Sequence, residues 1–273
     1  MCMNDAHIYC TPEQVEDEFR AVIAMYQMYY GHLRMGNFRV RLSLHDRSSE
    51  KFVDRYEDWE HTEDIVRRVL HNLNVDYEEE KGEAAFYGPK VDIQVKNLMG
   101  REETVSTCQL DFVMPERFDL TYVDVDGERK RPYILHRAPL STHERMISFL
   151  IEFYGGAFPT WMAPVQVRLI PVNDEVLDYA RNLESKLRSV FFRADIDTSD
   201  ESFNKKIRNA VTRKIPNIWI LGKQEAEQGS ITWRRHAVKD QKSLPVADAM
   251  ALLEILRTNR TMDNFADVAI WQQ

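Results

Sequence analysis

The chain has 273 residues, of which 44% are hydrophobic, so it has enough apolar material for one large domain or two ordinary ones. It contains no run of about 18 apolar residues and no charged-then-apolar leader, so it predicts neither a membrane span nor a secretory signal. A net charge of -8 argues against a protein that coats nucleic acid by bulk attraction, and three cysteines leave any disulfide framework with an odd thiol. We expect a cytoplasmic protein whose cysteines are free thiols or ligands.

The two ends of the chain differ in charge. Residues 1–165 hold 19 Lys and Arg against 29 Asp and Glu, whereas residues 166–273 hold 17 against 15. Near the junction, the segment 155–164 contains two glycines and two prolines, which interrupt helices and strands. This pattern predicts two domains, at 1–164 and 165–273.

The first region predicts a long helix and then mainly strands. Thr11 is the expected N-cap, Pro12 the first helical residue and Gln14 the partner in a capping box, and apolar residues at helical spacing continue to about residue 30. The further elements expected here are a strand at 37–44, a helix carrying Trp59 to Leu73, strands at 83–88, 90–97, 104–114, 118–125 and 131–137, and a helix from Thr142 to Tyr154. Asp126-Gly127 predicts a hairpin turn.

The second region alternates strands with helices, which is typical of a small α/β module. The expected elements are strands at 165–172, 191–196 and 217–222, helices at 176–187 and 203–214, a hairpin, and a last helix from Ala247. The predicted fold class of the whole chain is therefore mixed α/β.

Asp5 and His7 stand two positions apart at the start of the chain. If residues 3–9 form a strand, both side chains lie on one face with Tyr9, while Cys10 lies on the other. Asp5 and His7 then serve one pocket. A structural histidine partnered by Asp5 explains the same pattern, and a second histidine brought close by the fold would favour a functional site.

His136 ends a predicted strand, and a turn then leads to the helix that opens at Thr142. The start of a helix suits an anionic ligand, because free N–H groups and the positive end of the helix dipole both lie there. Arg145, in the first turn, carries a guanidinium group that fits a phosphate. The alternative is a surface arginine paired with Glu152 or a neighbouring acid.

Two further segments carry polar groups at strand positions. AFYGPK places an aromatic residue and a Gly-Pro turn directly before Lys90, and STCQLDF places Thr107, Gln109 and Asp111 on one strand face. Either pattern also fits an antiparallel sheet with one solvated face. Each segment by itself is a weak indication of a binding site.

The combination and order of these segments are a stronger indication of function than any one of them alone. The segments are, in chain order, NDAHIYC, AFYGPK, QLDF, HRA followed by ER, and FYGG followed by P, W, P and QV. Together they resemble the catalytic core and anticodon-binding domain of threonyl-tRNA synthetases, which are class II aminoacyl-tRNA synthetases. The resemblance runs from residue 3 to about residue 258. It implies an antiparallel-sheet catalytic core, incomplete at its amino-terminal end, followed by a small α/β anticodon-binding domain.

The resemblance also implies a reaction and its participants. In this family, ATP with Mg²⁺ and threonine form threonyl adenylate, and the threonine is then transferred to tRNA(Thr). The implied zinc ligands are His7 and His136, and Asp5 would accept the threonine hydroxyl. Tyr87, Lys90 and Gln109 would line the threonine and adenylate pocket, and Arg145 would bind the triphosphate of ATP. The implied catalytic residues are Arg145, Lys90 and Gln109. Ser141 would lie beside the nucleotide and Thr142 beside the substrate.

A basic helix and a later strand are the expected tRNA-binding elements of the second region. The helix from Ser202 is expected to bury its apolar residues and to present Lys205, Lys206 and Arg208 to phosphates. Arg234 and Arg235, on the strand, would reach bases or backbone. The alternative is an ordinary solvated helix face.

Several positions depart from the family pattern. Ser141 replaces a glycine and Thr142 a small residue, while Met3 and Thr104 stand where glutamines are common. The family's dimer-interface motif, its α-phosphate arginine, its cysteine zinc ligand and any editing domain are not recognised in this sequence. We expect a piece of a longer homodimeric enzyme. The alternative is a non-catalytic, synthetase-like paralogue or fragment that binds tRNA or a protein partner.

Overall fold

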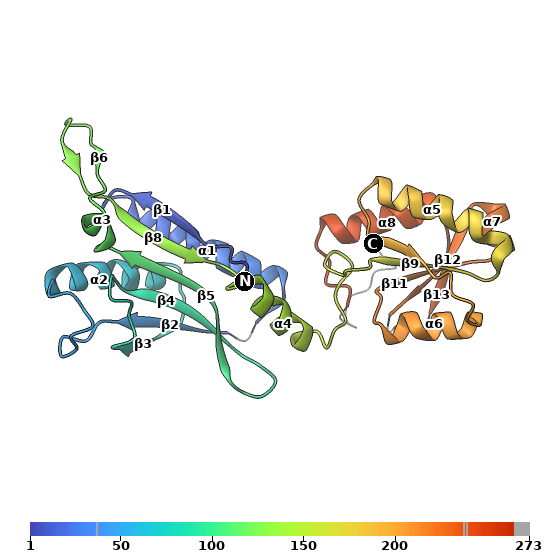
Figure 1. Ribbon diagram of the computed structural model, residues 1–273, viewed down its shortest axis with the longest axis horizontal. Coiled ribbons are helices and arrows are strands. Elements are labelled where there is room, and N and C mark those ends of the chain that lie inside the picture. Colours follow the sequence, from blue (N-terminus) through green and yellow to red (C-terminus); the bar gives the residue numbers. More distant parts are fainter. Residues whose placement is uncertain (37, 237, 239, 265–273) are drawn as a thin grey trace. The chain divides into compact units, whose positions relative to one another are not determined.

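The computed structural model describes residues 1–36, 38–236, 238 and 240–264 (Figure 1). The chain divides into two compact units, Met1–Glu152 and Phe153–Gln273. This division lies before the boundary that the sequence predicted at residue 164. The reason is that the intervening segment is bonded to the second unit, for example through Thr160, whose backbone N–H donates to Asp263 at 2.8 Å.

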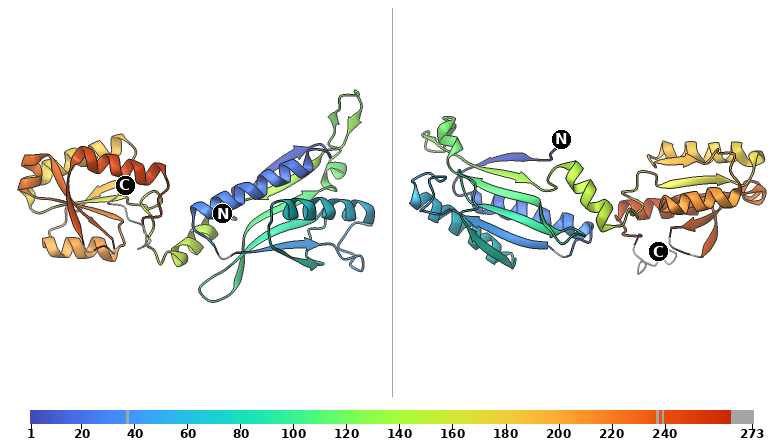
Figure 2. Two further views of the ribbon diagram at one scale, coloured as in Figure 1. Left: turned by 180° about the vertical axis from the view of Figure 1, so that it is seen from behind. Right: turned by 60° about the horizontal axis from the view of Figure 1, so that its bottom comes forward.

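The first unit is built on a six-stranded sheet with helices on one face (Figures 1 and 2). Its neighbouring strands are antiparallel, except for the last pair, which is parallel. In spatial order the strands are β1 (Ala6–Cys10), β8 (Tyr133–Ala138), β5 (Glu102–Asp111), β4 (Lys90–Lys96), β2 (Phe38–Leu44) and β3 (Tyr77–Lys81). Three helices, α1 (Val15–His32), α2 (Tyr56–Asn72) and α4 (His143–Phe153), and the short α3 (Met114–Arg117) complete the unit.

Helix α1 covers one face of this sheet and leaves the other face open for a site. Phe19 and Tyr26 are fully buried, and the Tyr26 hydroxyl donates to the backbone oxygen of Thr107 at 2.5 Å. The helix begins three residues later than the capping residues Thr11 and Pro12 predicted, at the first residue of its apolar pattern, Val15. The residues before it form a turn, in which the Thr11 N–H donates to Gln14 Oε1 at 2.9 Å, which is half of the expected capping box.

The strand predicted at 83–88 is wrong, because these residues form a turn with a single bridge between Ala85 and Gly88. A Cβ at Gly88 would lie 1.7 Å from the backbone oxygen of Leu110, so the close approach to β5 requires glycine. The strand predicted at 118–125 shrinks to β6 (Tyr122–Val123), which pairs with β7 (Arg129–Lys130) around the expected hairpin turn.

Two elements of the first unit were not predicted. Strand β3 has the sequence YEEEK, whose charge run conceals a strand, and two of its glutamates pair with Arg39 and Arg41 of neighbouring β2. Helix α3 is a single turn, and Asp111 at the end of β5 accepts hydrogen bonds from the N–H groups that open it. Strand β3 is stabilised by contacts with residues distant in sequence. Helix α3 is stabilised by the side chain at the end of the strand that precedes it.

The second unit is a five-stranded sheet with helices on both faces. The strands lie in the order β10 (Ala194–Ile196), β9 (Val167–Pro171), β11 (Asn217–Leu221), β12 (Ser230–Arg235) and β13 (Gln241–Pro245). Helices α5 (Leu177–Ser189) and α8 (Val246–Thr258) pack on the face that carries Trp219 and Trp233, and α6 (Phe203–Thr212) packs on the other face. A 3-10 turn, η1 (Asp174–Val176), and a short helix, α7 (Lys223–Gln228), complete the unit.

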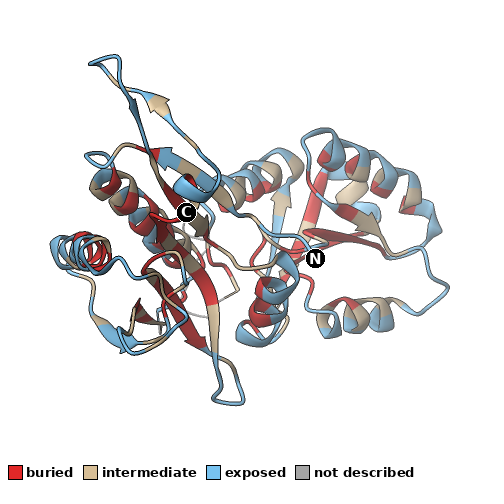
Figure 3. Cartoon of the chain, turned by 60° about the vertical axis from the view of Figure 1, so that its left-hand side comes forward, coloured by how far each residue is buried: buried red, intermediate tan, exposed pale blue. Residues whose placement is uncertain are grey.

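In each unit the central strands are largely buried, the edge strands β3 and β13 are mainly exposed, and the helices turn one face outward (Figure 3). The observed mixed α/β architecture confirms the fold class predicted from the sequence. Within the part of the chain that the structure describes, none of the helices combines the length and apolar content needed to cross a bilayer.

Candidate active site

The open face of the first sheet carries a row of side chains from four neighbouring strands. In the strand register, Lys90 of β4 lies opposite Gln109 of β5, Gln109 lies opposite His136 of β8, and His136 lies opposite His7 of β1. Residues directly opposite each other in a sheet project from the same face. We call Lys90, Gln109, His136 and His7 the cross-strand row. The fold thus brings together four residues that the sequence spreads over 130 positions.

The two histidines of the cross-strand row are in direct contact. Their ring centroids lie 4.6 Å apart, and the ring planes are nearly perpendicular at 88°. His7 is exposed, whereas His136 is 26% exposed and its Nε2 lies 2.8 Å from Oδ2 of the fully buried Asp111. The second histidine expected from the sequence is therefore beside the first.

Tyr87 extends the row at its centre. Its hydroxyl donates a hydrogen bond to Gln109 Oε1, and its ring centroid lies 5.2 Å from that of His136. Burial, reinforced by the charges of Asp111 and Asp92, raises the pKa of the Tyr87 hydroxyl. The hydroxyl therefore remains protonated at neutral pH and acts as a donor to Gln109.

Lys90 is fixed at the start of β4 by a buried carboxylate. Its Nζ lies 3.0 Å from Oδ2 of Asp92, which also accepts a hydrogen bond from Arg41 at 2.9 Å. Asp92 is only 2% exposed. The sequence indicated Lys90 but not the Arg41–Asp92 pair, because Arg41 reaches the other two side chains only through the pairing of β2 with β4.

The residues before β1 lie beside the start of α4. Met3 forms a bridge with Thr142, and the Leu140 N–H donates to Asn4 Oδ1 at 3.3 Å. Asp5 is exposed and directly precedes β1, two positions before His7. The structure therefore places Asp5 near the end of the cross-strand row that is formed by His7.

Thr142 is the N-cap of α4, as the sequence predicted, since its Oγ1 accepts a hydrogen bond from the N–H of Arg145 at 3.2 Å. Arg145 itself is exposed in the first turn of that helix. Ser141, directly before the cap, has a φ of +52°. This backbone conformation favours glycine, which explains why the family pattern has glycine at this position.

Replacing Ser141 with glycine is expected to stabilise the first unit by about 1 kcal/mol, because it removes the strain of an L side chain in the left-handed region. The gain is measurable as slower amide hydrogen exchange in α4. A Ser48→Gly control changes an exposed turn residue that does not have a positive φ, and it should not stabilise the protein. Equal effects of the two substitutions would contradict the strain argument.

The cysteines differ in reactivity. Burial, together with the charge of Glu18, raises the pKa of Cys10 to about 11, and burial also raises the pKa of Cys108. Cys2 is exposed. Cys10 faces away from His7 along β1, so it does not join the histidine pair.

Iodoacetamide is expected to modify Cys2 in the native protein at neutral pH and to leave Cys10 and Cys108 intact, because the thiolate is the reactive form. Peptide mass spectrometry reads the three positions separately. Modification of Cys10 should increase only as the pH approaches 11 or when urea unfolds the chain. Rapid labelling of Cys10 at neutral pH without unfolding would contradict this account.

The described residues bring two imidazoles together but do not complete a metal site. Among the residues that the structure describes, no group of three or more His, Cys, Asp or Glu side chains is placed to hold a metal ion. His7 and His136 are suited to zinc by their chemistry and their contact, since zinc accepts neutral imidazole nitrogens. A third protein ligand would have to come from outside this set.

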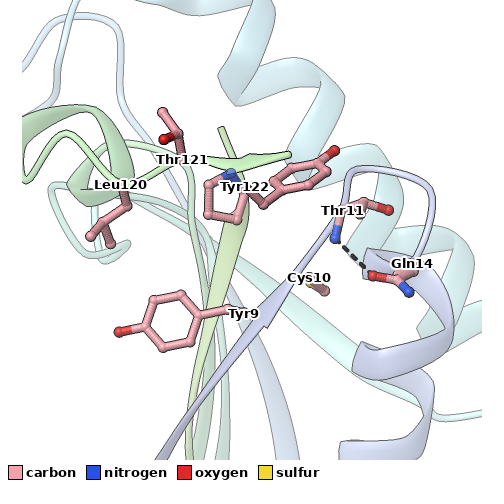
Figure 4. Close-up of a pocket in the computed structure, with 8 residues that line it drawn as sticks. Tyr9, Cys10, Thr11, Gln14, Leu120, Thr121 and Tyr122 are labelled. Carbon is pink, nitrogen blue, oxygen red and sulfur yellow. Dashed lines mark hydrogen bonds between the residues drawn. The ribbon is translucent and has the colours of Figure 1, made fainter. Parts of the chain in front are cut away.

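A cavity of about 420 Å³ lies at the other end of β1, next to the strands of the β6–β7 hairpin (Figure 4). Its lining comprises Tyr9, Cys10, Thr11, Gln14, Leu120, Thr121, Tyr122 and Pro132. None of these residues belongs to the cross-strand row. This cavity was not predicted from the sequence, because its walls come from segments more than 100 positions apart.

The second unit presents some, but not all, of the predicted RNA-binding residues. Lys205 and Arg208 are exposed on α6, and Lys205 pairs with Glu201 at 2.7 Å. Lys206 is half-buried, and its Nζ lies 3.4 Å from the backbone oxygen of Asp197. These three side chains leave part of α6 positively charged.

The two arginines of β12 face opposite ways. Arg234 lies opposite Ile218, which packs against α6, so Arg234 is on the α6 face of the sheet. Arg235 is 3% exposed and its guanidinium forms an ion pair with the buried carboxylate of Asp263. The prediction that Arg235 contacts tRNA is therefore wrong for this structure. Successive strand residues alternate in direction, so the two arginines cannot share one surface.

Two family signatures match the chain. Residues 1–154 match the tRNA synthetase class II core domain (G, H, P, S and T), and residues 166–255 match the anticodon binding domain. The chain belongs to the class II tRNA synthetase family.

Two curated relatives are named threonine–tRNA ligases. The threonine–tRNA ligase of Listeria monocytogenes serotype 4a (strain HCC23) is 47% identical over 246 residues, which cover 89% of this chain and 38% of the relative. That of Oceanobacillus iheyensis is 45% identical over 256 residues, which cover 93% of this chain and 40% of the relative. The chain spans about two fifths of the length of these relatives. The resemblance to threonyl-tRNA synthetases predicted from the sequence is confirmed.

Solved structures agree with this resemblance. The RNA binding domain of threonyl-tRNA synthetase from Cryptosporidium parvum Iowa II has a TM-score of 0.85 and 31% identity, covering 92% of this chain and 63% of that one. A putative threonyl-tRNA synthetase, ThrRS-1, from Aeropyrum pernix has a TM-score of 0.76 and 27% identity, covering 96% of this chain and 63% of that one.

Proposed function

We propose that this chain is part of a threonine–tRNA ligase, which activates threonine with ATP and transfers it to tRNA(Thr). The observation that supports this most strongly is the cross-strand row: four residues matched to the threonine site by sequence motif alone lie side by side on one sheet face, with Tyr87 bonded to Gln109. The active enzyme is a cytoplasmic homodimer, and it contains the remaining three fifths or so of the relatives' length that this chain does not match.

The proposed threonine site lies at the His7 end of the cross-strand row. His7 and His136 would hold a zinc ion together with a ligand from elsewhere in the protein. When bound, zinc supplies an electrophilic centre that takes the amino and hydroxyl groups of threonine. Asp5 accepts the hydroxyl proton in a hydrogen bond. Valine lacks this hydroxyl, so selection rests on a polar contact, which discriminates better than a test of shape.

The other residues of the row bind and orient the adenylate. Tyr87, Lys90 and Gln109 line the adjoining sheet surface, and their partners Asp92 and Thr107 hold Lys90 and Gln109 in place. Arg41 shares the Asp92 carboxylate with Lys90, so the three groups together carry a net positive charge that favours anionic oxygens of the adenylate. Gln109 supplies an amide that can donate or accept.

The start of α4 is the proposed site for ATP with Mg²⁺. Arg145 stabilises the negative charge of the triphosphate, with Ser141 and Thr142 beside it at the helix N-terminus. Ser141 holds the positive φ of the family's glycine, so the backbone path is kept although a side chain is added. Its hydroxymethyl group is the observation that favours the second candidate function, a synthetase-like protein that binds tRNA without activating threonine.

Threonine-dependent exchange of pyrophosphate into ATP tests the proposed function. The assay uses this chain joined to the part of the Listeria monocytogenes relative that it does not match. We expect exchange with threonine and far less with valine, and we expect Asp5→Ala to reduce the preference for threonine. A folded, dimeric protein that binds tRNA(Thr) but catalyses no exchange would refute the enzyme and establish the non-catalytic alternative.

The second unit is the proposed tRNA(Thr)-binding part, through Lys205, Lys206 and Arg208 of α6 and through Arg234. The double variant Lys205→Glu/Lys206→Glu is expected to weaken tRNA(Thr) binding about tenfold or more and to reduce its salt dependence, because phosphate contacts release counterions. Filter binding across a salt series measures both effects.

A matched control separates local contact from bulk charge. Arg181→Glu/Lys186→Glu makes the same change in net charge on α5, which packs on the opposite face of the second sheet. Its affinity for tRNA(Thr) should stay within about twofold of the unchanged protein. Equal losses in the two double variants would exclude α6 as a specific binding surface.

A further inference from the structure

The side chain of Asp111 is held in one orientation by the backbone. This carboxylate is fully buried at the end of β5. Its Oδ1 accepts hydrogen bonds from the N–H groups of Val113 at 2.9 Å and Met114 at 2.8 Å, which open α3. Two fixed donors on one oxygen leave the other oxygen, Oδ2, directed toward the cross-strand row.

Oδ2 of Asp111 faces one nitrogen of His136. The distance from Oδ2 to His136 Nε2 is 2.8 Å. When the carboxylate of Asp111 is ionised it can only accept hydrogen bonds, and Nε2 is then the nitrogen that carries the proton. The lone pair of a neutral His136 is then on Nδ1. Tyr87 and His7, whose rings lie 5.2 Å and 4.6 Å from the ring of His136, flank the imidazole.

We propose that Asp111 is a positioning residue that fixes the ring and the tautomer of His136, so that Nδ1 is the nitrogen available for a zinc ion. The part of this inference that concerns zinc rests on the proposed function, whereas the tautomer does not. Carboxylates commonly orient metal-binding histidines in this way, and their loss typically lowers metal affinity about 10- to 100-fold. The sequence placed Asp111 on the site face without indicating a partner.

The competing explanation is that Asp111 only caps α3. The isosteric Asp111→Asn variant separates the two roles. Its Oδ1 still accepts from the N–H groups of Val113 and Met114, so the cap and the fold are retained. Its NH₂ group then faces His136 Nε2 and donates to it. That donation requires an unprotonated Nε2, which moves the proton of a neutral His136 to Nδ1 and blocks the nitrogen that would bind zinc.

The tautomer is measured by two-dimensional ¹H–¹⁵N correlation spectra of the histidine rings in the full 273-residue chain at a pH where the rings are neutral. The His136 signals are assigned by their loss in His136→Gln. We expect Nε2–H in the unchanged protein, Nδ1–H in Asp111→Asn, and no change in Asp92→Asn, a control that alters an equally buried aspartate of the same sheet. A protein with Nδ1–H before mutation, or an unaltered tautomer in Asp111→Asn, would overturn the proposal. The spectrum of the unchanged protein decides the first point even if the variant does not fold.

Zinc affinity gives a second readout. It is measured by competition for Zn²⁺ with a fluorescent chelator in the longer protein, that is, this chain joined to the part of the Listeria monocytogenes relative that it does not match. Asp111→Asn is expected to weaken zinc binding about 10- to 100-fold, while Asp92→Asn has no effect. His7→Ala should weaken zinc binding without changing the tautomer of His136. If the unchanged protein binds no zinc, the proposed zinc site is refuted. The tautomer of His136 then decides the role of Asp111 by itself. Equal zinc affinity of Asp111→Asn and the unchanged protein would contradict the inference.

Discussion

Replacing His136 with alanine is expected to lower threonine-dependent pyrophosphate exchange by the longer protein by a factor of about a hundred or more. Losing a single electrostatic contact at a reacting centre typically costs this much. His136 contacts His7 and Tyr87 and is bonded to Asp111, so its removal takes away one proposed zinc ligand and the contacts that hold the other ligand's ring. Initial rates of exchange at saturating ATP measure the effect, with His7→Ala giving a similar loss.

The matched control for this prediction is His71→Ala. His71 is an exposed histidine in the last turn of α2, on the helix-covered side of the sheet. Its replacement should leave the exchange rate within about twofold, because surface substitutions away from a site have small effects. Normal exchange by a folded His136→Ala variant would remove His136 from the site.

Replacing Asp263 with alanine is expected to destabilise the second unit by about 3–5 kcal/mol, which is the usual result of breaking a buried ion pair from one side. The fully buried carboxylate of Asp263 pairs with Arg235 and also accepts hydrogen bonds from the N–H and hydroxyl of Thr160, at 2.8 and 2.6 Å. Without it, a guanidinium that is 3% exposed keeps, among the residues that the structure describes, the backbone oxygen of residue 263 as its hydrogen-bond partner.

Hydrogen exchange mass spectrometry measures this loss in the second unit separately from the first. Amides of β11 and β12 should exchange about a hundredfold or more faster in Asp263→Ala, since each 1.4 kcal/mol corresponds to about a factor of ten. Asp178→Ala, which removes a 95% exposed carboxylate, should change the exchange rates little. A loss of less than about 1 kcal/mol in Asp263→Ala would show that the buried pair is dispensable.

Local patterns in the sequence predicted most of the elements and the faces of the strands that carry the site. The alternation of side chains along residues 3–9 predicted that His7 and Cys10 lie on opposite faces of the strand. In the structure Cys10 is buried and His7 is exposed. The turn and cap before α4 were also readable, because Thr142 has the side chain that an N-cap requires. These features depend on neighbours within a few positions.

What the sequence did not predict depends on pairing between distant segments. Nothing in the local sequence specifies that β8 lies between β1 and β5, which is what makes His7, His136 and Gln109 neighbours. The family resemblance supplied that link. The ion pair of Arg235 with Asp263 was missed because the two residues are 28 positions apart and are brought together by the packing of the second unit.

Segments whose local sequence is typical of another structure were the other reason why the predicted elements differ from the observed ones. The glutamate run of β3 is typical of a solvated loop, and its strand is stabilised by pairing with β2 and by arginines on that neighbour. AFYGPK has the apolar content of a strand, but Gly88 and Pro89 bring the chain against β5 as a turn. In both segments the tertiary surroundings override the local preference.

We propose that the open face of the first sheet binds threonine with the help of a zinc ion. An anomalous difference map recorded at the zinc absorption edge, from crystals of the longer protein grown with threonine, tests it most directly. We predict one zinc peak at about 2.0–2.1 Å from a ring nitrogen of both His7 and His136, with Nδ1 as the ligand atom of His136. Zinc bound elsewhere, or a threonine-activating enzyme with no metal between these two rings, would contradict the account.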